Sequence, residues 1–287
     1  MTNPTAPAAA DPAAFVDNAV TNSGSSFLTA MRFLPPDKRQ AMYALYAYCR
    51  EVDDIADESG TPEEKRQRLA EWRVEIERMF NGAPGMPISC VLSDAVARFD
   101  LQKADLLALI DGMEMDAART VRIADEAELA LYCDRVACSV GRLSNRIFGV
   151  APEASDALAR ALGDALQMTN ILRDLAEDAE RDRLYVPISL LGAHGISEVD
   201  DAAGILAHPR FPEACAALAA KTRRQYAVAR AIMAGCERRA VRPAAIMMEV
   251  YRAILLRLEA RGWRHLDKAV AVPRLLKLWI ALRHGVL

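Results

Sequence analysis

The chain has 287 residues, a formal net charge of -3 and a hydrophobic content of 52%. This nearly balanced charge lacks the strong basic excess of nucleic-acid-binding proteins, so nucleic acid is excluded as an expected partner. The six scattered cysteines form no C-x-x-C pair, which argues against a zinc site or a disulfide framework and favours reduced thiols in the cytoplasm.

The N-terminal segment 1–22 is rich in Ala and Pro and lacks the basic and apolar regions of a signal peptide. It is predicted to be a disordered lead-in to one domain, 23–287. The small polar segment 23–27 opens that domain and admits two interpretations. It could be an ordinary helix cap, which is the default, or Ser25 and Ser26 could offer hydroxyl groups to a phosphate.

The rest of the chain is predicted to be all-α. Alanine is abundant, glycine is sparse, and the alternating Val/Ile/Thr runs typical of strands are missing from the sequence. Proline and glycine mark where helices begin and end. Helices are expected at 28–34, 37–59, 62–80, 91–99, 103–119, 126–149, 157–178, 213–239, 243–263 and 273–287. No apolar run in the sequence is long enough to span a bilayer.

The segment 43–58 carries the first of two acidic motifs. On a helix, four of its side chains would fall within about 60° of one another and share one stripe. They are Tyr46, Arg50, Asp53 and Asp57. Arg50 could simply form a salt bridge with the acids one turn later. That interpretation accounts for the arginine, but not for a second Asp-x-x-x-Asp pair elsewhere in the chain.

The second acidic motif lies in the segment 167–178. Four of its side chains would fall within about 80° of one another on a helix. They are Gln167, Asn170, Asp174 and Asp178. Because the preceding residues are apolar, this stripe is expected to face the interior. Carboxylates facing a core are costly without cations, and a hard divalent cation such as Mg²⁺, which prefers oxygen ligands, would compensate them.

Two familiar carboxylate sites are excluded by the sequence. A di-iron bundle needs Glu-x-x-His motifs, and none of the four histidines has Glu three residues before it. An EF-hand needs its acids on a loop rather than a helix. What remains is a diphosphate held by Mg²⁺ between two acidic faces, where metal ions and arginine neutralise the leaving group. An apolar interior would hold a hydrocarbon chain and keep water from a carbocation.

The two motifs together resemble the paired signatures of the squalene/phytoene synthases. The first is Tyr-x-x-x-Arg-x-x-Asp-Asp-x-x-Asp at 46–57. The second is Gln-x-x-Asn-x-x-Arg-Asp-x-x-x-Asp at 167–178, with Tyr-Val-Pro behind it at 185–187. The surrounding sequence, including Gly-Met-Glu-Met-Asp at 112–116, is most similar to bacterial members that make presqualene diphosphate for hopanoids. The resemblance covers roughly residues 23 to 265.

This resemblance implies an isoprenoid-synthase helical bundle with a central apolar cavity, which joins two farnesyl diphosphates head to head into presqualene diphosphate. It implies roughly two to three Mg²⁺ ions per site, with the ligands Asp53, Asp57, Asn170, Asp174 and Asp178. It assigns prenyl diphosphate binding to Ser25, Ser26, Arg50, Arg173, Gln167, Tyr185 and Tyr251. Tyr46 and Tyr132 would line the reacting centre, where a ring or phenol could stabilise cationic charge or relay a proton.

Several alternatives stay open at this stage. Reduction onward to squalene with NADPH depends on the shape of the cavity; the chain has no Rossmann-type fingerprint, but family members that use NADPH lack one as well. A phytoene synthase, which joins two geranylgeranyl diphosphates, would differ by side chains deep in the pocket that the sequence does not identify. A terpene cyclase acting on one substrate and a non-catalytic scaffold are further alternatives, although the intact aspartate pairs argue against a scaffold.

The C-terminal segment 274–283 is basic and amphipathic. Leu275 and Trp279 could contact the inner face of a membrane while Lys and Arg side chains meet the headgroups. Packing of this helix on the body of the protein is the default interpretation. The protein is therefore expected in the cytoplasm, with peripheral membrane contact as the alternative.

Overall fold

The structure, a computed structural model, describes residues 16, 31, 34–197, 201–266 and 268–285. Within these residues nearly all regular structure is helical, which confirms the predicted all-α fold. The predicted lead-in, apart from Val16, and the segment with Ser25 and Ser26 lie outside the described residues. Both therefore stay predictions.

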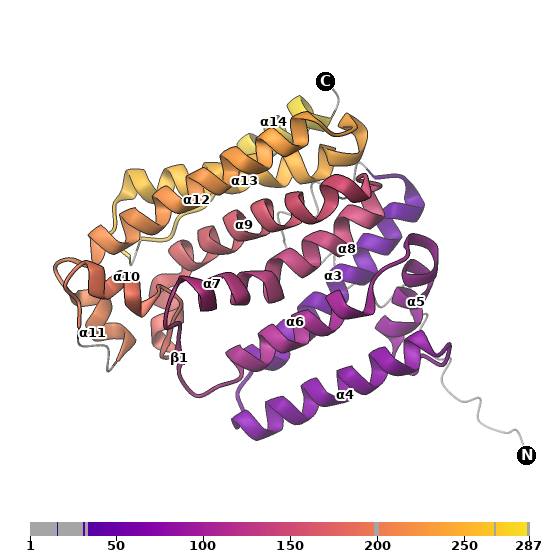
Figure 1. Ribbon diagram of the computed structural model, residues 1–287, viewed down its shortest axis with the longest axis horizontal. Helices are drawn as coiled ribbons and strands as arrows, with labels where there is room; N and C mark the ends of the chain where they lie inside the picture. The colour runs from indigo at the N-terminus through magenta and orange to yellow at the C-terminus, as the bar shows by residue number, and fades with distance from the viewer. Residues whose placement is uncertain (1–15, 17–30, 32–33, 198–200, 267, 286–287) are drawn as a thin grey trace, which may run out of the picture.

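The long helices lie as nearly parallel rows, from α4 at one edge to α12 and α13 at the other (Figure 1). The helices are α3 Pro36–Asp57, α4 Pro62–Phe80, α5 Pro87–Phe99, α6 Lys103–Asp116, α7 Glu126–Cys133, the π-helix η1 Asp134–Cys138, α8 Ser139–Phe148, α9 Pro152–Glu180, α10 Ile188–Ala193, α11 Ala202–Ala207, α12 Phe211–Ala234, α13 Arg238–Arg261 and α14 Arg274–Gly285. Two short strands, β1 Val121–Arg122 and β2 Arg183–Leu184, pair in parallel with Val121 opposite Arg183.

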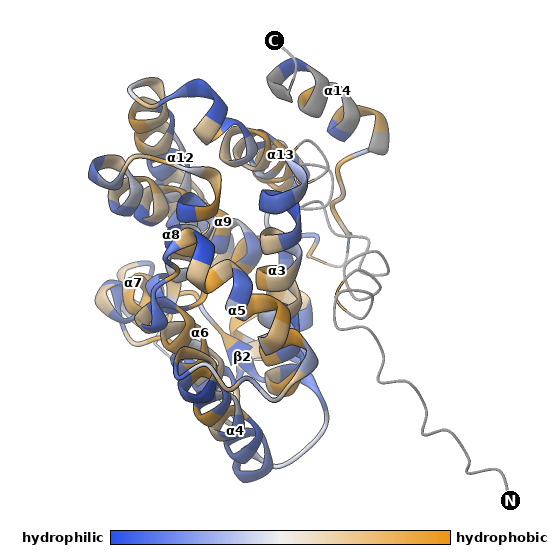
Figure 2. Ribbon diagram, turned by 90° about the vertical axis from the view of Figure 1, so that its right-hand side faces the viewer, coloured by the Kyte–Doolittle hydropathy of each residue, from blue (hydrophilic) through white to orange (hydrophobic). Residues whose placement is uncertain are grey.

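Two apolar cores hold these rows together. One is built mainly from α3, α4, α5 and α6 and includes the fully buried Tyr48 and Leu106. The other is built mainly from α9, α12 and α13 and includes Leu172, Phe211 and Leu258. The outer helix α4 is mostly hydrophilic because it buries only one face (Figure 2). Each large apolar side chain buried in a core contributes roughly 1.5–3 kcal/mol, so the helices bordering the space between the cores are firmly placed.

Some predicted helix boundaries were wrong. Pro243 was expected to begin a helix, yet it lies inside α13, which starts at Arg238. A proline so near the helix start removes one intrahelical hydrogen bond, and the surrounding contacts outweigh that loss. Helix α5 begins at Pro87 rather than at 91, because proline suits the first helical position. Helix α6 ends at Asp116 rather than at 119.

The π-helix η1 interrupts the single helix predicted for 126–149. Insertions of this kind are rare and frequently occur at functional sites. Helix α9 packs very closely on η1: a Cβ atom at Gly163 would lie 2.8 Å from Cys138 Sγ and 2.9 Å from the Cys138 backbone nitrogen. The two helices therefore meet backbone to backbone at this glycine.

Replacing Gly163 by Ala is expected to destabilise the protein by about 1–3 kcal/mol, because the new methyl group would overlap with backbone that cannot move aside. In an unobstructed helix the same change stabilises by about 0.5–1 kcal/mol. Gly192 of α10 is the matched control, since a Cβ atom there would have nothing within 4 Å. Urea unfolding measures both variants, and equal unfolding midpoints would contradict the close approach of α9 and η1.

The C-terminal helix α14 packs along α13 and buries Ile280, which confirms the default interpretation of this segment. Its other face leaves Leu275 81% and Trp279 53% exposed. The guanidinium carbon of Arg283 lies 5.1 Å from the centre of the Trp279 ring. None of the described helices is long and apolar enough to cross a membrane. Contact of α14 with a membrane surface stays a prediction.

Candidate active site

A cavity of about 690 Å³ is lined by residues of both cores. Its walls come from α3, α6, α7, η1, α8, α9 and α13. Much of the lining is apolar, including Met42, Leu45, Leu109, Met113, Val136, Val140, Phe148, Leu158, Leu162, Leu166 and Met247. The charged lining residues lie toward the C-terminal ends of α3, α6 and α9, and just beyond α9. The cavity thus combines an apolar part with a part rich in carboxylates and arginines.

The predicted stripe on α3 faces this cavity. All four of its members line the wall: Tyr46, Arg50, Asp53 and Asp57. Arg50 Nη1 lies 3.3 Å from Asp53 Oδ2, and Arg50 Nη2 lies 2.6 Å from Asp54 Oδ1. The ordinary salt bridge that the sequence allowed is therefore present, and the same arginine also lines the cavity.

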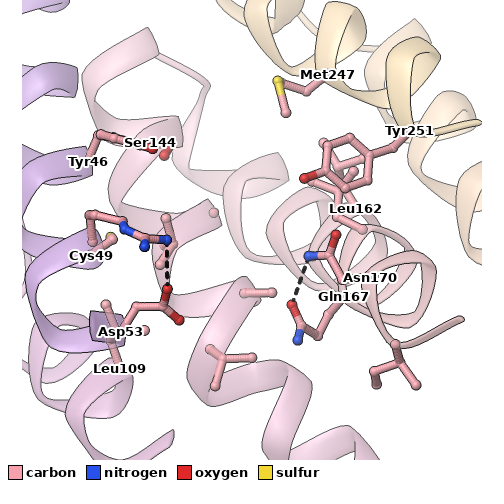
Figure 3. A pocket seen from close by; sticks show the side chains of 18 of the residues that line it. Tyr46, Cys49, Asp53, Leu109, Ser144, Leu162, Gln167, Asn170, Met247 and Tyr251 are labelled. Atoms are coloured by element: carbon pink, nitrogen blue, oxygen red, sulfur yellow. Dashed lines mark hydrogen bonds and ion pairs between the residues drawn. The ribbon is translucent and has the colours of Figure 1, made fainter. Parts of the chain in front are cut away.

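The predicted stripe on α9 faces the same cavity. Its members on the wall are Gln167, Asn170, Asp174 and Asp178, joined by Arg173. Arg173 holds Asp174 with two bonds, Nε to Oδ1 at 2.7 Å and Nη2 to Oδ2 at 2.6 Å. Figure 3 shows Tyr46 and Asp53 on one wall and Gln167 and Asn170 on the facing wall, with Tyr251 of α13 beside Asn170. The two stripes oppose each other across the cavity.

Burial and the charges of neighbouring groups shift the pKa values of several carboxyls in the two stripes. Loss of hydration, assisted by the charge of Asp174, raises the pKa of Asp178 to about 8. Loss of hydration and the charge of Asp57 likewise raise the pKa of Asp53 to about 6. Burial would raise the pKa of Asp57 as well, but its bonds to Arg183 and the neighbouring Arg181 hold it below its ordinary value.

Asp116, at the end of α6, joins two of the four tyrosines singled out from the sequence, Tyr132 and Tyr185. Tyr185 Oη donates to Asp116 Oδ1 at 2.6 Å, and Tyr132 Oη donates to Oδ2 at 3.0 Å. The two rings stack with their centres 4.8 Å apart. Burial raises the pKa of Asp116 to about 6 in spite of these bonds, and burial beside this carboxyl raises the pKa of both phenols. A proton relay through Tyr132 would therefore lead to Asp116.

Arg183 on β2 is a site residue whose place near the second motif is visible in the sequence but to which no role was assigned from the sequence. Its side chain is only 8% exposed. Nη1 lies 2.7 Å from Asp57 Oδ1, and Nη2 donates to the carbonyl oxygens of Ala56 at 2.9 Å and Asp116 at 3.0 Å. The pairing of β2 with β1 fixes this arginine beside the acidic part of the cavity. The sequence feature that could have identified it is the pair Arg181 and Arg183, which follows directly after the second motif.

The donor groups in the cavity fit magnesium chemistry. They are oxygen atoms of carboxylates and an amide, the ligands that Mg²⁺ prefers. Asn170 Oδ1 is buried and accepts no hydrogen bond from the part of the chain that the structure describes. Among those residues no three acidic, His or Cys side chains come close enough to hold an ion by themselves. A metal ion here would therefore need further oxygen atoms, which a diphosphate between the two stripes could provide.

The sequence of this chain is similar to those of known proteins. The sequence model of the squalene/phytoene synthase family matches residues 20–276. A presqualene diphosphate synthase from Sinorhizobium fredii is 42% identical over 278 residues, covering 97% of this chain and 99% of the relative. A phytoene synthase from Thermus thermophilus is 38% identical over 250 residues, covering 86% and 83%.

A solved structure with a similar fold also carries the name of a squalene synthase. The squalene synthase HpnC from Alicyclobacillus acidocaldarius superposes with a TM-score of 0.79 at 26% identity, covering 88% of this chain and 94% of its own. The family match spans nearly the whole chain, including both acidic stripes, Asp116 and Arg183. The chain belongs to the squalene/phytoene synthase family.

Proposed function

We propose that the protein is a prenyltransferase that joins two farnesyl diphosphates head to head into presqualene diphosphate, with Mg²⁺ as its metal. The observation that carries the proposal is the pair of carboxylate-bearing helix faces opposed across a largely apolar cavity. The relative named presqualene diphosphate synthase covers nearly this whole chain at a higher identity than the phytoene synthase does. In the proposed reaction one substrate loses diphosphate, and the C2–C3 double bond of the other attacks the resulting allylic cation. Loss of a proton from the new cation then closes the cyclopropane ring of the product.

The metal ligands in this proposal come from both stripes. They are Asp53, Asp57, Asn170, Asp174 and Asp178. Mg²⁺ bound there would neutralise charge on the diphosphate and make it a better leaving group. Asp53 and Asp178 are suited to binding a cation because burial, and then the charge of a neighbouring aspartate, raises their pKa values, and a bound cation would stabilise their ionised forms. The buried Asn170 Oδ1 offers a further oxygen.

The remaining polar residues would position the substrates. Arg50 and Arg173 present guanidinium groups to the space between the stripes and would share their charge with the diphosphates. Gln167 and Tyr251 lie on the cavity wall on either side of Asn170 (Figure 3). Ser25 and Ser26, outside the described residues, are retained in this role from the sequence alone.

The aromatic residues would act on the reacting carbon atoms. Tyr46, Tyr132 and Tyr185 line the cavity, and a ring face attracts cationic charge. Asp116 holds Tyr132 and Tyr185 in one stacked arrangement. The surrounding apolar lining would exclude water, which would otherwise quench a carbocation to an alcohol.

A product assay tests the proposal. Purified protein is incubated with farnesyl diphosphate and Mg²⁺, without and with NADPH, and the products are identified by mass spectrometry. We expect a C30 diphosphate in the absence of NADPH and no change on its addition. Squalene appearing only with NADPH would extend the reaction by one step. Product formation only from geranylgeranyl diphosphate, as a C40 compound, would overturn the proposal in favour of phytoene synthesis.

A further inference from the structure

A second cavity, of about 390 Å³, lies directly behind the acidic part of the first. Asp57, Arg181 and Arg183 line both cavities and form the wall between them. The second cavity differs chemically from the first. The described residues that line it include no aromatic and no large aliphatic side chain. It is therefore unsuited to a hydrocarbon and suited to a small polar ligand.

Four cationic side chains converge on this second cavity: Lys65, Arg119, Arg181 and Arg183. Lys65 and Arg183 reach the same atom, because Lys65 Nζ lies 2.8 Å and Arg183 Nη2 lies 2.9 Å from the carbonyl oxygen of Ala56. Like charges brought so close together repel each other unless an anion lies nearby. The structure thus concentrates positive charge at one point of the cavity wall.

The carboxylates of the cavity do not balance these cations. Asp57 is bonded to Arg183 at 2.7 Å and to Arg181 at 2.9 Å, so one carboxylate serves two guanidinium groups. Glu63, the other acid in the lining, has a side chain that is 78% exposed to solvent. Arg119 is exposed and forms no ion pair within the part of the chain that the structure describes. Neutralising Asp57 therefore accounts for Arg181 and Arg183. Lys65 bonds the carbonyl oxygen of Ala56, but among the described residues no carboxylate forms an ion pair with Lys65 or Arg119.

We propose that this second cavity binds inorganic diphosphate, as a subsite for the leaving group of the reaction. Lysine and arginine side chains converging from three segments of the chain provide the charge-assisted donors that phosphate oxygens require. The identity of the anion rests on the proposed function, since the condensation releases one diphosphate next to the shared wall. Metal ions bound to Asp57 would compete for its carboxylate and leave the guanidinium groups of Arg181 and Arg183 available to the departing anion.

Calorimetric titration of the purified protein with sodium diphosphate in EDTA isolates this subsite. Without metal ions the carboxylates of the first cavity repel the anion, so binding should report the second cavity. We expect the double variant Lys65→Ala/Arg119→Ala to bind diphosphate at least about tenfold more weakly, because it loses two charge-assisted contacts. Arg68→Ala is the matched control, since Arg68 belongs to the same helix but pairs with Glu58 outside the cavity.

Inhibition of the enzymatic reaction by its product diphosphate provides a second test of the subsite. Inhibition by added diphosphate should weaken by a similar factor in the double variant, while KM for farnesyl diphosphate stays within about twofold of the wild-type value. Arg119→Glu, on an exposed side chain, provides an independent variant whose fold can be checked by thermal melting. Wild-type protein that binds no diphosphate in EDTA, or a control that loses as much affinity as the double variant, would overturn the subsite. Because the titration needs no turnover, an unexpected reaction product would not change the measured diphosphate affinity.

Discussion

Replacing Asp178 by Asn is expected to slow product formation by orders of magnitude and at the same time to stabilise the metal-free protein. Asp178 lines the cavity, and loss of hydration together with the charge of Asp174 raises its pKa to about 8 from an ordinary 3.8. Such a carboxylate opposes folding when it ionises, so an evolved protein retains it for function. Losing a charged group of this kind at a reacting centre costs about 10²–10³-fold in rate.

The stability gain should depend on pH in a defined window. A carboxyl whose folded pKa lies above its unfolded value keeps a proton in the folded state that the unfolded state has released. Its contribution to stability is therefore full below the ordinary pKa of 3.8 and is lost as the pH rises toward about 8. Asp53 and Asp116, with pKa values raised to about 6, also lower stability as the pH rises, but they do so equally in wild type and in the Asp178→Asn variant. The stability difference between wild type and variant should thus grow as the pH rises above 3.8 and be largest above about 8.

Thermal melting in EDTA measures this effect. At pH 8.5 we expect the Asp178→Asn variant to be more stable by on the order of 1 kcal/mol or more, which raises the melting temperature by about 2–4 °C for each kcal/mol. Glu177→Gln is the matched control, because Glu177 is the preceding residue on α9 and its side chain is 65% exposed. A variant that melts below wild type, or keeps full activity, would remove Asp178 from the proposed metal site.

Helical periodicity alone predicted the two acidic stripes of the site. The family resemblance added Arg173, Tyr132, Tyr185 and Tyr251, which also line the cavity. Helices α3 and α9 are long and uninterrupted, so a turn of about 100° per residue is enough to gather each stripe on one face. Both stripes do line the cavity. The same reasoning could not foresee η1, because a π-helical turn changes the angle per residue and has no clear sequence signal.

The missing parts depend on contacts between distant segments. Arg183 lies beyond the end of α9 on a two-residue strand, where periodicity says nothing about direction. Its bond to the carbonyl oxygen of Asp116 joins residues 67 positions apart, and its bond to Asp57 joins residues 126 positions apart. Asp116 in turn meets Tyr185 across 69 positions. Such contacts follow from the packing of α3, α6 and β2 around one another, which a single sequence does not specify.

Replacing Arg183 by Met is expected to destabilise the protein by about 3 kcal/mol, the lower end of the cost of breaking a buried ion pair, because Asp57 is 33% exposed. The change would leave Asp57 with one cation, and it would leave the carbonyl oxygens of Ala56 and Asp116 without their donor. Arg183→Lys should recover only part of this loss, because an ammonium group cannot reproduce the fork of a guanidinium. Urea unfolding measures both variants.

Arg181→Met is the matched control, because Arg181 binds the same carboxylate, with Nη1 2.9 Å from Asp57 Oδ2. Its side chain is 39% exposed, against 8% for Arg183. Exposed ion pairs contribute about 0–1 kcal/mol because water solvates both partners when the pair is broken. Although both arginines bind one carboxylate, the losses in free energy of unfolding caused by Arg183→Met and Arg181→Met should therefore differ by about 2 kcal/mol or more. Equal losses of stability in the two variants would mean that Arg183 contributes only its charge. A large difference would mean that the burial of Arg183 and its two bonds to carbonyl oxygens hold α3, α6 and β2 in the arrangement on which both cavities depend.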